Sequence, residues 1–143
     1  MTEPDSTVLK QLKKLYKEHL QELETTYKFH RFHSPKLDEG YFDAKPMVLL
    51  LGQYSVGKST FIRYMLGEDY PDIRIGEEPT TENFIAIMHS DTSRTIPGNA
   101  LANDPTAPFK PLQKFGNSFL SRFNAACLPN KLLEKVSFID TPG

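Results

Sequence analysis

Apolar residues recur at helical spacing over the first part of the chain. Between Asp5 and Tyr27 they lie three or four positions apart, at Leu9, Leu12, Leu15, Tyr16, Leu20, Leu23 and Tyr27. This period places them on one face of a helix. We therefore expect one amphipathic helix over this range, with an apolar stripe that packs on another part of the protein. An aromatic connector follows it, and we place a domain boundary between residues 1–44 and 45–143.

Three short apolar runs bounded by turn residues predict β-strands. They are Pro46–Leu51, expected to be buried, Phe84–His89 and Lys135–Asp140. The segment KSTFIRYML, residues 58–66, predicts a helix that ends near Gly67, because glycine is the residue that most readily adopts the left-handed conformation beyond a helix.

The pattern between the last two strands is less regular. Residues 90–111 are rich in Pro, Gly and Asn, which predicts a long loop. Residues 112–128 predict a second helix, since Phe115, Phe119 and Phe123 share a helical face, although Gly116 weakens it. The sequence therefore predicts three strands and two helices after residue 45.

Composition restricts the class of protein. The chain has 143 residues with 38% hydrophobic and 24% charged residues, which is typical of a globular domain. The net charge of −1 provides no general attraction to nucleic acid. The single cysteine, Cys127, permits no disulfide within the chain and suits the cytoplasm. The chain stops at SFIDTPG, directly after a predicted strand, so we expect it to be part of a longer protein.

The motif with the clearest chemistry is LGQYSVGKST, residues 51–60. Gly52, Gly57, Lys58 and Ser59 match the phosphate-loop pattern G-x-x-x-x-G-K-[ST]. Glycines let the backbone wrap a phosphate, the following helix N-terminus favours an anion, the lysine neutralises phosphate charge, and the serine hydroxyl suits Mg²⁺. A plain polar turn is the alternative. The residues expected to bind nucleotide here are Gly52, Gln53, Tyr54, Ser55, Val56, Gly57, Lys58, Ser59 and Thr60.

The segment SFIDTPG supplies a second candidate site. An apolar strand ending in Asp140 resembles the Walker-B arrangement, in which a carboxylate reaches Mg²⁺. Gly143 is expected to offer a backbone N–H to the γ-phosphate. Together with the phosphate loop, these features predict a P-loop α/β domain of the GTPase-like class.

The loop EEPTTEN, residues 77–83, contains a candidate switch threonine. A hydroxyl or carbonyl from such a loop completes the Mg²⁺ shell when the γ-phosphate is present. Thr81 is preferred to Thr80 for this role, and a structural turn is the alternative for both. Gln53 is a candidate to orient the attacking water, with a solvent-facing side chain as the alternative. Lys58, Thr81 and Gln53 are thus the predicted catalytic residues, and Ser59, Thr81 and Asp140 the predicted metal ligands.

Several longer segments extend the comparison to one family. FDAKPMVLLLGQYSVGKSTFIRYML, GEEPTTENFIAIMH, TIPGNAL, PFKPLQKFGNSFLSRF and LPNKLLEKVSFIDTPG resemble the EHD proteins, dynamin-related ATPases with a C-terminal EH domain. The resemblance runs from about Leu9 to Gly143. It implies an incomplete dynamin-type G domain, preceded by an N-terminal helix that belongs to a helical domain.

The resemblance also implies function. EHD proteins bind ATP rather than GTP with Mg²⁺, form dimers and larger assemblies on anionic membranes, and act in endocytic recycling. This implies a slow ATPase for the full-length protein, an inactive fragment for these residues alone, and peripheral location on endosomal or plasma membrane. Endocytic adaptor proteins would bind through parts outside this chain. Two alternatives remain open: a dynamin- or septin-like GTPase, and a nucleotide-binding scaffold without hydrolysis.

Overall fold

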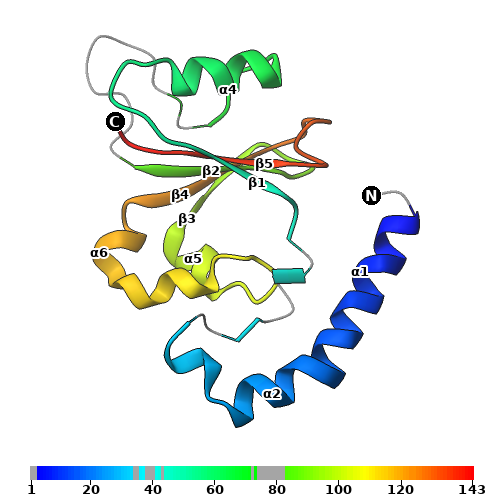
Figure 1. The fold of residues 1–143 in the computed structure, drawn as a ribbon. Helices are drawn as coiled ribbons and strands as arrows, with labels where there is room; N and C mark the ends of the chain where they lie inside the picture. The colour runs from blue at the N-terminus through cyan, green and yellow to red at the C-terminus, as the bar shows by residue number, and fades with distance from the viewer. Residues whose placement is uncertain (1–2, 34–35, 38–40, 43, 72, 74–82) are drawn as a thin grey trace. The chain divides into compact units, whose positions relative to one another are not determined.

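The structure is a computed structural model that describes residues 3–33, 36–37, 41–42, 44–71, 73 and 83–143. The chain divides into two compact units, Met1–Ala44 and Lys45–Gly143. The first is helical, and the second contains a five-stranded sheet with helices on its faces (Figure 1).

The first unit consists of consecutive helical segments. α1 (Glu3–Leu15) continues into a π-helical turn, η1 (Tyr16–Leu20), and then into α2 (Gln21–Thr26). A short 3-10 helix, η2 (Phe29–Arg31), follows. The helix predicted between Asp5 and Tyr27 is confirmed, and the π-helical turn interrupts it in the middle.

Tyr16 is the buried residue of this helical run. Its ring packs against Phe42 with 5.3 Å between centroids, and its hydroxyl donates to Glu24 Oε2 at 2.7 Å. The same hydroxyl accepts the backbone N–H of Leu37 at 3.2 Å. Leu9 is half-buried, and the remaining residues of the apolar stripe are at least half exposed, at Leu12, Leu15, Leu20, Leu23 and Tyr27.

The second unit is built on one mixed sheet. Its strands are β1 (Met47–Leu50), β2 (Phe84–His89), β3 (Arg94–Pro97), β4 (Phe123–Leu128) and β5 (Ser137–Asp140). Their order across the sheet is β1-β5-β2-β4-β3. The β1–β5 and β2–β4 pairs are parallel, whereas the β5–β2 and β4–β3 pairs are antiparallel. All three predicted strands are present.

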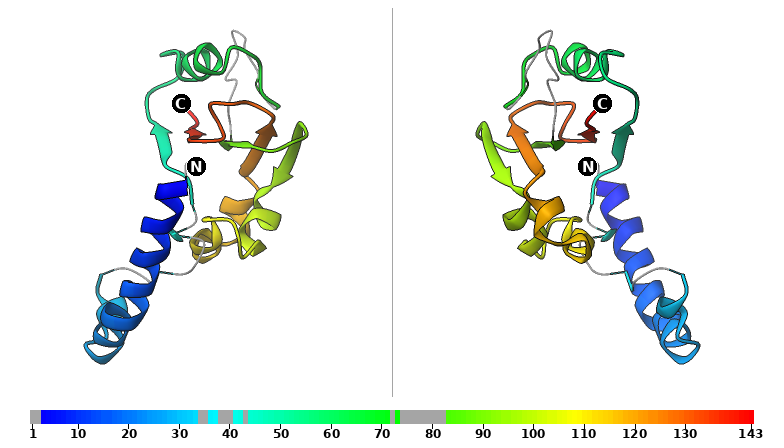
Figure 2. Two further views of the ribbon diagram at one scale, coloured as in Figure 1. Left: turned by 90° about the vertical axis from the view of Figure 1, so that its right-hand side faces the viewer. Right: turned by 90° about the vertical axis from the view of Figure 1, so that its left-hand side faces the viewer.

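Helices cover both faces of this sheet (Figures 1 and 2). α4 (Lys58–Leu66) lies on one face. α5 (Gly98–Asn103), the 3-10 helix η3 (Lys110–Phe115) and α6 (Gly116–Leu120) lie on the other. The helix predicted over residues 58–66 is confirmed with the same bounds, and Gly67 ends it in the left-handed conformation.

The alternation of side chains along β2 explains these layers. Ile87 packs with Ile62 of α4 in one buried cluster. The neighbouring Ala86 points to the opposite face and packs with Leu101 and Phe109 in a second cluster. A strand presents successive side chains to opposite faces, so one strand contributes to two cores.

Two predictions for the second half of the chain are wrong. Residues 90–111 are not one loop, because β3 and α5 lie within them. Residues 112–128 are not one helix, because they form part of η3, then α6, and then β4. β4 lies between β2 and β3, and its residues other than Asn124 are apolar and buried, so its pairing with two neighbours decides its structure.

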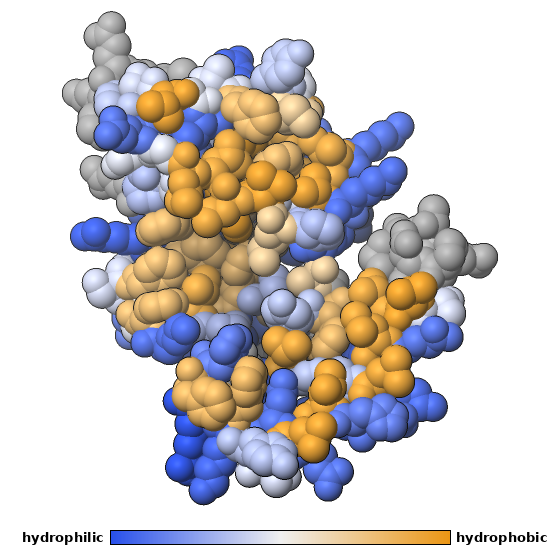
Figure 3. All heavy atoms as spheres, viewed as in Figure 1, coloured by the Kyte–Doolittle hydropathy of each residue, from blue (hydrophilic) through white to orange (hydrophobic). Residues whose placement is uncertain are grey.

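The first strand is present but not buried as predicted. β1 lies at the edge of the sheet, and its residues Met47, Val48 and Leu49 are all about half exposed. Figure 3 shows hydrophobic side chains gathered on the face of the molecule around β1. Consecutive side chains of a strand point to opposite faces, so the exposure of these three residues means that neither face of β1 is fully covered there.

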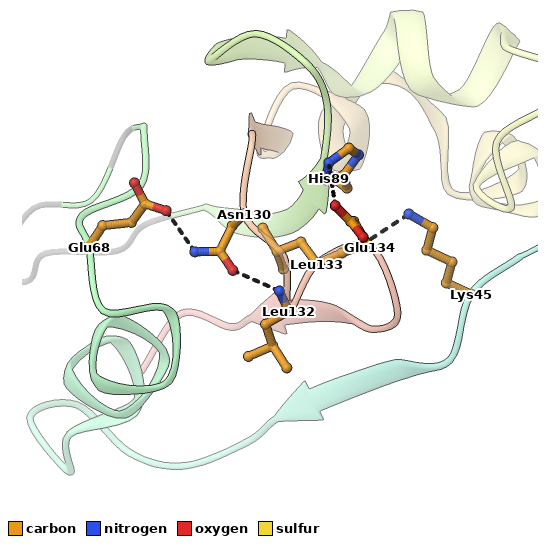
Figure 4. Close-up of polar contacts among 7 residues, drawn as sticks. All are labelled: Lys45, Glu68, His89, Asn130, Leu132, Leu133 and Glu134. Atoms are coloured by element: carbon orange, nitrogen blue, oxygen red, sulfur yellow. Dashed lines mark hydrogen bonds and ion pairs between the residues drawn. The ribbon is translucent and has the colours of Figure 1, made fainter. Parts of the chain in front are cut away.

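Polar contacts hold the segment before β5 in place (Figure 4). The Asn130 side-chain amide donates to Glu68 Oε1 at 2.6 Å and to the Leu66 carbonyl oxygen at 3.0 Å. Lys45 Nζ donates to the Leu133 carbonyl oxygen at 3.1 Å. These bonds tie the end of α4 and the start of β1 to the chain that leads into β5, which carries Asp140.

Candidate functional site

The loop between β1 and α4 has the backbone geometry of an anion cradle. Ser55 and Gly57 both adopt positive φ angles, 61° and 90°. Positive φ turns successive backbone N–H groups toward a common concavity. A Cβ on Gly52 would lie 2.9 Å from Val56 Cγ2, so glycine permits the two ends of the loop to approach closely. The loop then enters α4 directly, where the helix dipole favours negative charge.

Lys58 fixes a positive charge against this loop. Its Nζ donates to the carbonyl oxygens of Gly52 at 2.7 Å and Gln53 at 2.9 Å. Lys58 is the first residue of α4, and its side chain reaches back so that the ammonium group contacts the start of the loop. A lysine held in this way can place a point charge on a phosphate group.

Ser59 and Asp140 meet although 81 positions separate them. The Ser59 hydroxyl donates to Asp140 Oδ2 at 2.6 Å. Asp140 is fully buried, and its register partner in β1 is Leu50, the last residue before the phosphate loop. Parallel strands end at the same edge of a sheet, so both motifs come together there. Among the residues that the structure describes, nothing bonds to Asp140 Oδ1.

The residues after Asp140 also lie against the phosphate loop. The Thr141 hydroxyl donates to the Leu50 carbonyl oxygen at 2.7 Å. A Cβ on Gly143 would lie 2.5 Å from the Tyr54 backbone N and Cα, so a side chain there would collide with the loop. The DTPG segment is therefore adjacent to the loop, as the sequence motifs predict.

The remaining predicted site residues are either exposed or outside the described part of the chain. Gln53, Tyr54 and Val56 are exposed in the loop, and Thr60 is exposed in the first turn of α4. Thr81, and its alternative Thr80, lie outside the described residues. The structure therefore brings Gly52, Lys58, Ser59, Asp140 and Gly143 into one region.

Tyr70 belongs to the site and was missed by the sequence analysis. Its side chain is 3% exposed, and its hydroxyl donates to Asp140 Oδ2 at 3.0 Å. Burial raises the pKa of Tyr70 well above its ordinary value, and the nearby Asp140 carboxylate raises it further. The phenol therefore stays a hydrogen-bond donor. Tyr70 lies in the polar stretch GEDYPD, where no periodic signal distinguishes a buried tyrosine from a loop residue.

The side-chain oxygen atoms of this site are suitable ligands for Mg²⁺. The ion prefers oxygen ligands and is usually held by one or two carboxylates together with substrate phosphates. Asp140 Oδ1, buried and without a partner in the described part of the chain, and the Ser59 hydroxyl are oxygens of this kind. Within the described residues, no three His, Cys, Asp or Glu side chains cluster for metal binding. A site completed by phosphate oxygens needs no such cluster.

The fold is an α/β domain, and the loop between β1 and α4 has the sequence pattern of a phosphate loop. The family model described as "Dynamin family" matches residues 48–143, two thirds of the chain. The chain belongs to the dynamin family. A second model, "N-terminal EH-domain containing protein", matches residues 11–43 and confirms the resemblance to EHD proteins.

Individual relatives agree with this assignment. The chain is 61% identical over 137 residues to EH domain-containing protein 3 of Homo sapiens and 56% identical to EH domain-containing protein 1 of Bos taurus. Each match covers 96% of this chain and 26% of the relative. The chain thus spans about a quarter of the length of the curated relatives it matches.

Solved structures of an oligomerised bacterial dynamin pair, described for long-range sensing and tethering of membranes, are also similar. One is 21% identical and covers 73% of this chain and 18% of its own. The other is 18% identical and covers 100% of this chain and 23% of its own. Both have a TM-score of 0.47.

Within the described residues, no helix is long and apolar enough to cross a membrane.

Proposed function

We propose that this chain is the nucleotide-binding part of a dynamin-related protein that binds a nucleoside triphosphate with Mg²⁺, preferring ATP to GTP. The observation that carries the proposal is the 2.6 Å hydrogen bond from Ser59 to Asp140. A plain turn at residues 51–60 would need no such contact. A fully buried carboxylate is costly unless donors or a cation satisfy it, so its position beside the loop favours a cation site.

Each residue has a role in this proposal. The backbone N–H groups of residues 52–59 hold the β- and γ-phosphates, and Lys58 places its charge on the same groups. Ser59 and Asp140 would hold Mg²⁺. The ion that these residues would hold would supply positive charge to offset the charge that develops during phosphoryl transfer. Gly143 donates its backbone N–H to the γ-phosphate.

Hydrolysis is the part of the proposal that rests most on the family. The intact protein would be a slow ATPase, in which Thr81 completes the Mg²⁺ shell and Gln53 orients the attacking water. The side chain of Gln53 is exposed, which leaves it accessible to solvent water. Catalysis would come from positioning and charge rather than from a general base.

Membrane remodelling is the wider function we propose. Similarity to EH domain-containing proteins over residues 11–43 and 48–143 supports it. The intact protein would assemble as a dimer or larger oligomer on anionic endosomal or plasma membrane and act in endocytic recycling. Residues 1–44 would belong to a helical domain and residues 45–143 to the nucleotide domain, a division that the two compact units support. Adaptor proteins would bind through other parts of the protein.

A titration of the intact protein tests the nucleotide assignment. ATPγS and GTPγS are added separately in a calorimeter with Mg²⁺ present. We expect binding heat with ATPγS alone. Heat with GTPγS alone would overturn the base preference while leaving the phosphate site in place. No heat with either nucleotide, from a folded sample, would favour a scaffold that binds neither.

A flotation experiment tests the membrane assignment separately. The intact protein is mixed with vesicles of phosphatidylserine and phosphatidylcholine, or of phosphatidylcholine alone, with and without ATPγS. We expect it to float with the anionic vesicles and to be released as salt increases, because the attraction between charges is screened. Equal binding to both vesicle types would contradict an anionic surface as the partner.

A further inference from the structure

We propose that Tyr70 is a positioning residue of this site: its hydroxyl holds Asp140 Oδ2 so that Asp140 Oδ1 is directed to the cation that accompanies the nucleotide. This inference rests on the proposed function and adds a specific residue to it. The two side chains are 70 positions apart and come from different elements, the chain after α4 and the end of β5.

The ring of Tyr70 is held by apolar packing. It belongs to the buried cluster that contains Ile62 and Leu66 of α4 and Leu133 before β5. The Tyr70 carbonyl oxygen also accepts the backbone N–H of Ile73 at 3.2 Å. With the ring fixed in this way, the direction of the hydroxyl is fixed too.

The carboxylate of Asp140 is bonded asymmetrically. Ser59 donates to Oδ2 at 2.6 Å and Tyr70 donates to the same oxygen at 3.0 Å. Oδ1 is buried and has no partner among the described residues. A buried carboxylate oxygen without a donor is unfavourable unless a cation or water takes that place. Ser59 and Tyr70 therefore satisfy Oδ2 and leave Oδ1 available to a cation.

Two donors are needed for this asymmetry. The Ser59 hydroxyl is short and rotates about its own bond, so it does not by itself fix the plane of the carboxylate. Tyr70 reaches Oδ2 from a packed ring and prevents the two carboxylate oxygens from exchanging places. Groups that orient a metal ligand in this way commonly change metal affinity by about 10- to 100-fold when removed.

The alternative is that Tyr70 only fills the core. Tyr70→Phe separates the two roles, because it keeps the ring in the apolar cluster and removes the hydroxyl. Tyr64→Phe is the matched control, since the same atom is removed from a side chain that is 83% exposed on α4.

The experiment measures how much Mg²⁺ strengthens nucleotide binding. The dissociation constant for ATPγS is determined by calorimetry on the intact protein, once with Mg²⁺ and once with EDTA, for the wild type and both variants. The ratio of the two constants is the gain due to Mg²⁺. We expect Tyr70→Phe to reduce this gain about tenfold and to leave the EDTA constant unchanged. We expect Tyr64→Phe to match the wild type.

Three outcomes would overturn the inference, and they are distinguishable. An unchanged gain in Tyr70→Phe would leave the proposed function standing and remove Tyr70 from it. An equal weakening with Mg²⁺ and with EDTA would assign Tyr70 a structural role only. A wild type that shows no gain from Mg²⁺ would contradict the proposed function and this inference together.

Discussion

Gly57 and Gly67 allow the geometry of the phosphate loop to be tested apart from the stability of the fold. Both have positive φ angles, 90° and 72°, and both flank α4. A Cβ at either position would meet nothing within 4 Å. Alanine at either position therefore introduces backbone strain without a collision, and the two variants differ only in which end of α4 they affect.

The expected cost follows from the backbone alone. A residue with a Cβ in the left-handed conformation costs about 1 to 2 kcal/mol relative to glycine. Gly67→Ala should lower the free energy of unfolding by this full amount, and Gly57→Ala should lower it by less. In Gly57→Ala the free loop can relieve the strain by turning its N–H groups away from the cradle. Binding must then restore the strained conformation, which weakens nucleotide affinity about tenfold.

The assay is a pair of measurements on each variant. Urea unfolding gives the free energy of unfolding, and titration with ATPγS in the presence of Mg²⁺ gives the dissociation constant. We expect a smaller loss of stability in Gly57→Ala than in Gly67→Ala, and weaker binding only in Gly57→Ala. Wild-type affinity in Gly57→Ala, or an equal loss of affinity in Gly67→Ala, would refute the assignment of the loop.

Three other changes probe the core, the thiol and the metal ligand. Gly98→Ala should destabilise the protein by about 3 kcal/mol or leave it insoluble, because its Cβ would lie 2.4 Å from the backbone oxygens of Leu120 and Phe123; a wild-type melting temperature would contradict this. Burial raises the pKa of the Cys127 thiol above 9.0, an effect that Arg94 partly opposes. The folded state therefore disfavours the thiolate, and this contribution to stability is complete below pH 9.0 and falls above it. Cys127→Ala should reduce the loss of unfolding free energy at alkaline pH, and an unchanged pH profile would contradict the assignment. Ser59→Ala should abolish most of the gain in nucleotide affinity from Mg²⁺ while retaining binding in EDTA, and calorimetry that shows equal losses would contradict its role as a ligand.

The phosphate loop and its flanking elements were predictable because their signals are local. β1 is a short apolar run before a glycine, and α4 lies between Gly57 and Gly67. Asp140 was predictable for a different reason. It ends an apolar run, which is the Walker-B arrangement, and the structure pairs that strand in parallel with β1. Recognition of two motifs was therefore enough to place Ser59 near Asp140.

The structure of residues 112–128 was not predictable from periodicity. The aromatic residues Phe115, Phe119 and Phe123 have helical spacing, yet Phe123 begins a strand. Apart from Asn124, the residues of β4 are apolar and buried on both faces, so they show no regular alternation and resemble a buried helix. Its pairing with β2 and β3 is a long-range fact that no local pattern reveals.

Tyr70 shows the same limitation within the site. It follows α4 in a polar stretch, and only the packed structure places its ring in the core and its hydroxyl beside Asp140. Thr141 is similar, since its bond to the Leu50 carbonyl oxygen depends on the pairing of β5 with β1. Residues whose role depends on tertiary contacts therefore need the fold before they can be identified.

The central claim is that residues 52–59 hold the phosphates of a nucleotide, and Lys58→Ala tests it most directly. Lys58 donates to two loop carbonyl oxygens, and its charge is the one that the loop positions. The control is Lys10→Ala, which removes an exposed lysine side chain of α1, away from the loop in the sequence. With Mg²⁺ and ATPγS in the calorimeter, we predict no detectable binding by Lys58→Ala and wild-type binding by the control. Wild-type affinity in a folded Lys58→Ala protein would contradict the account.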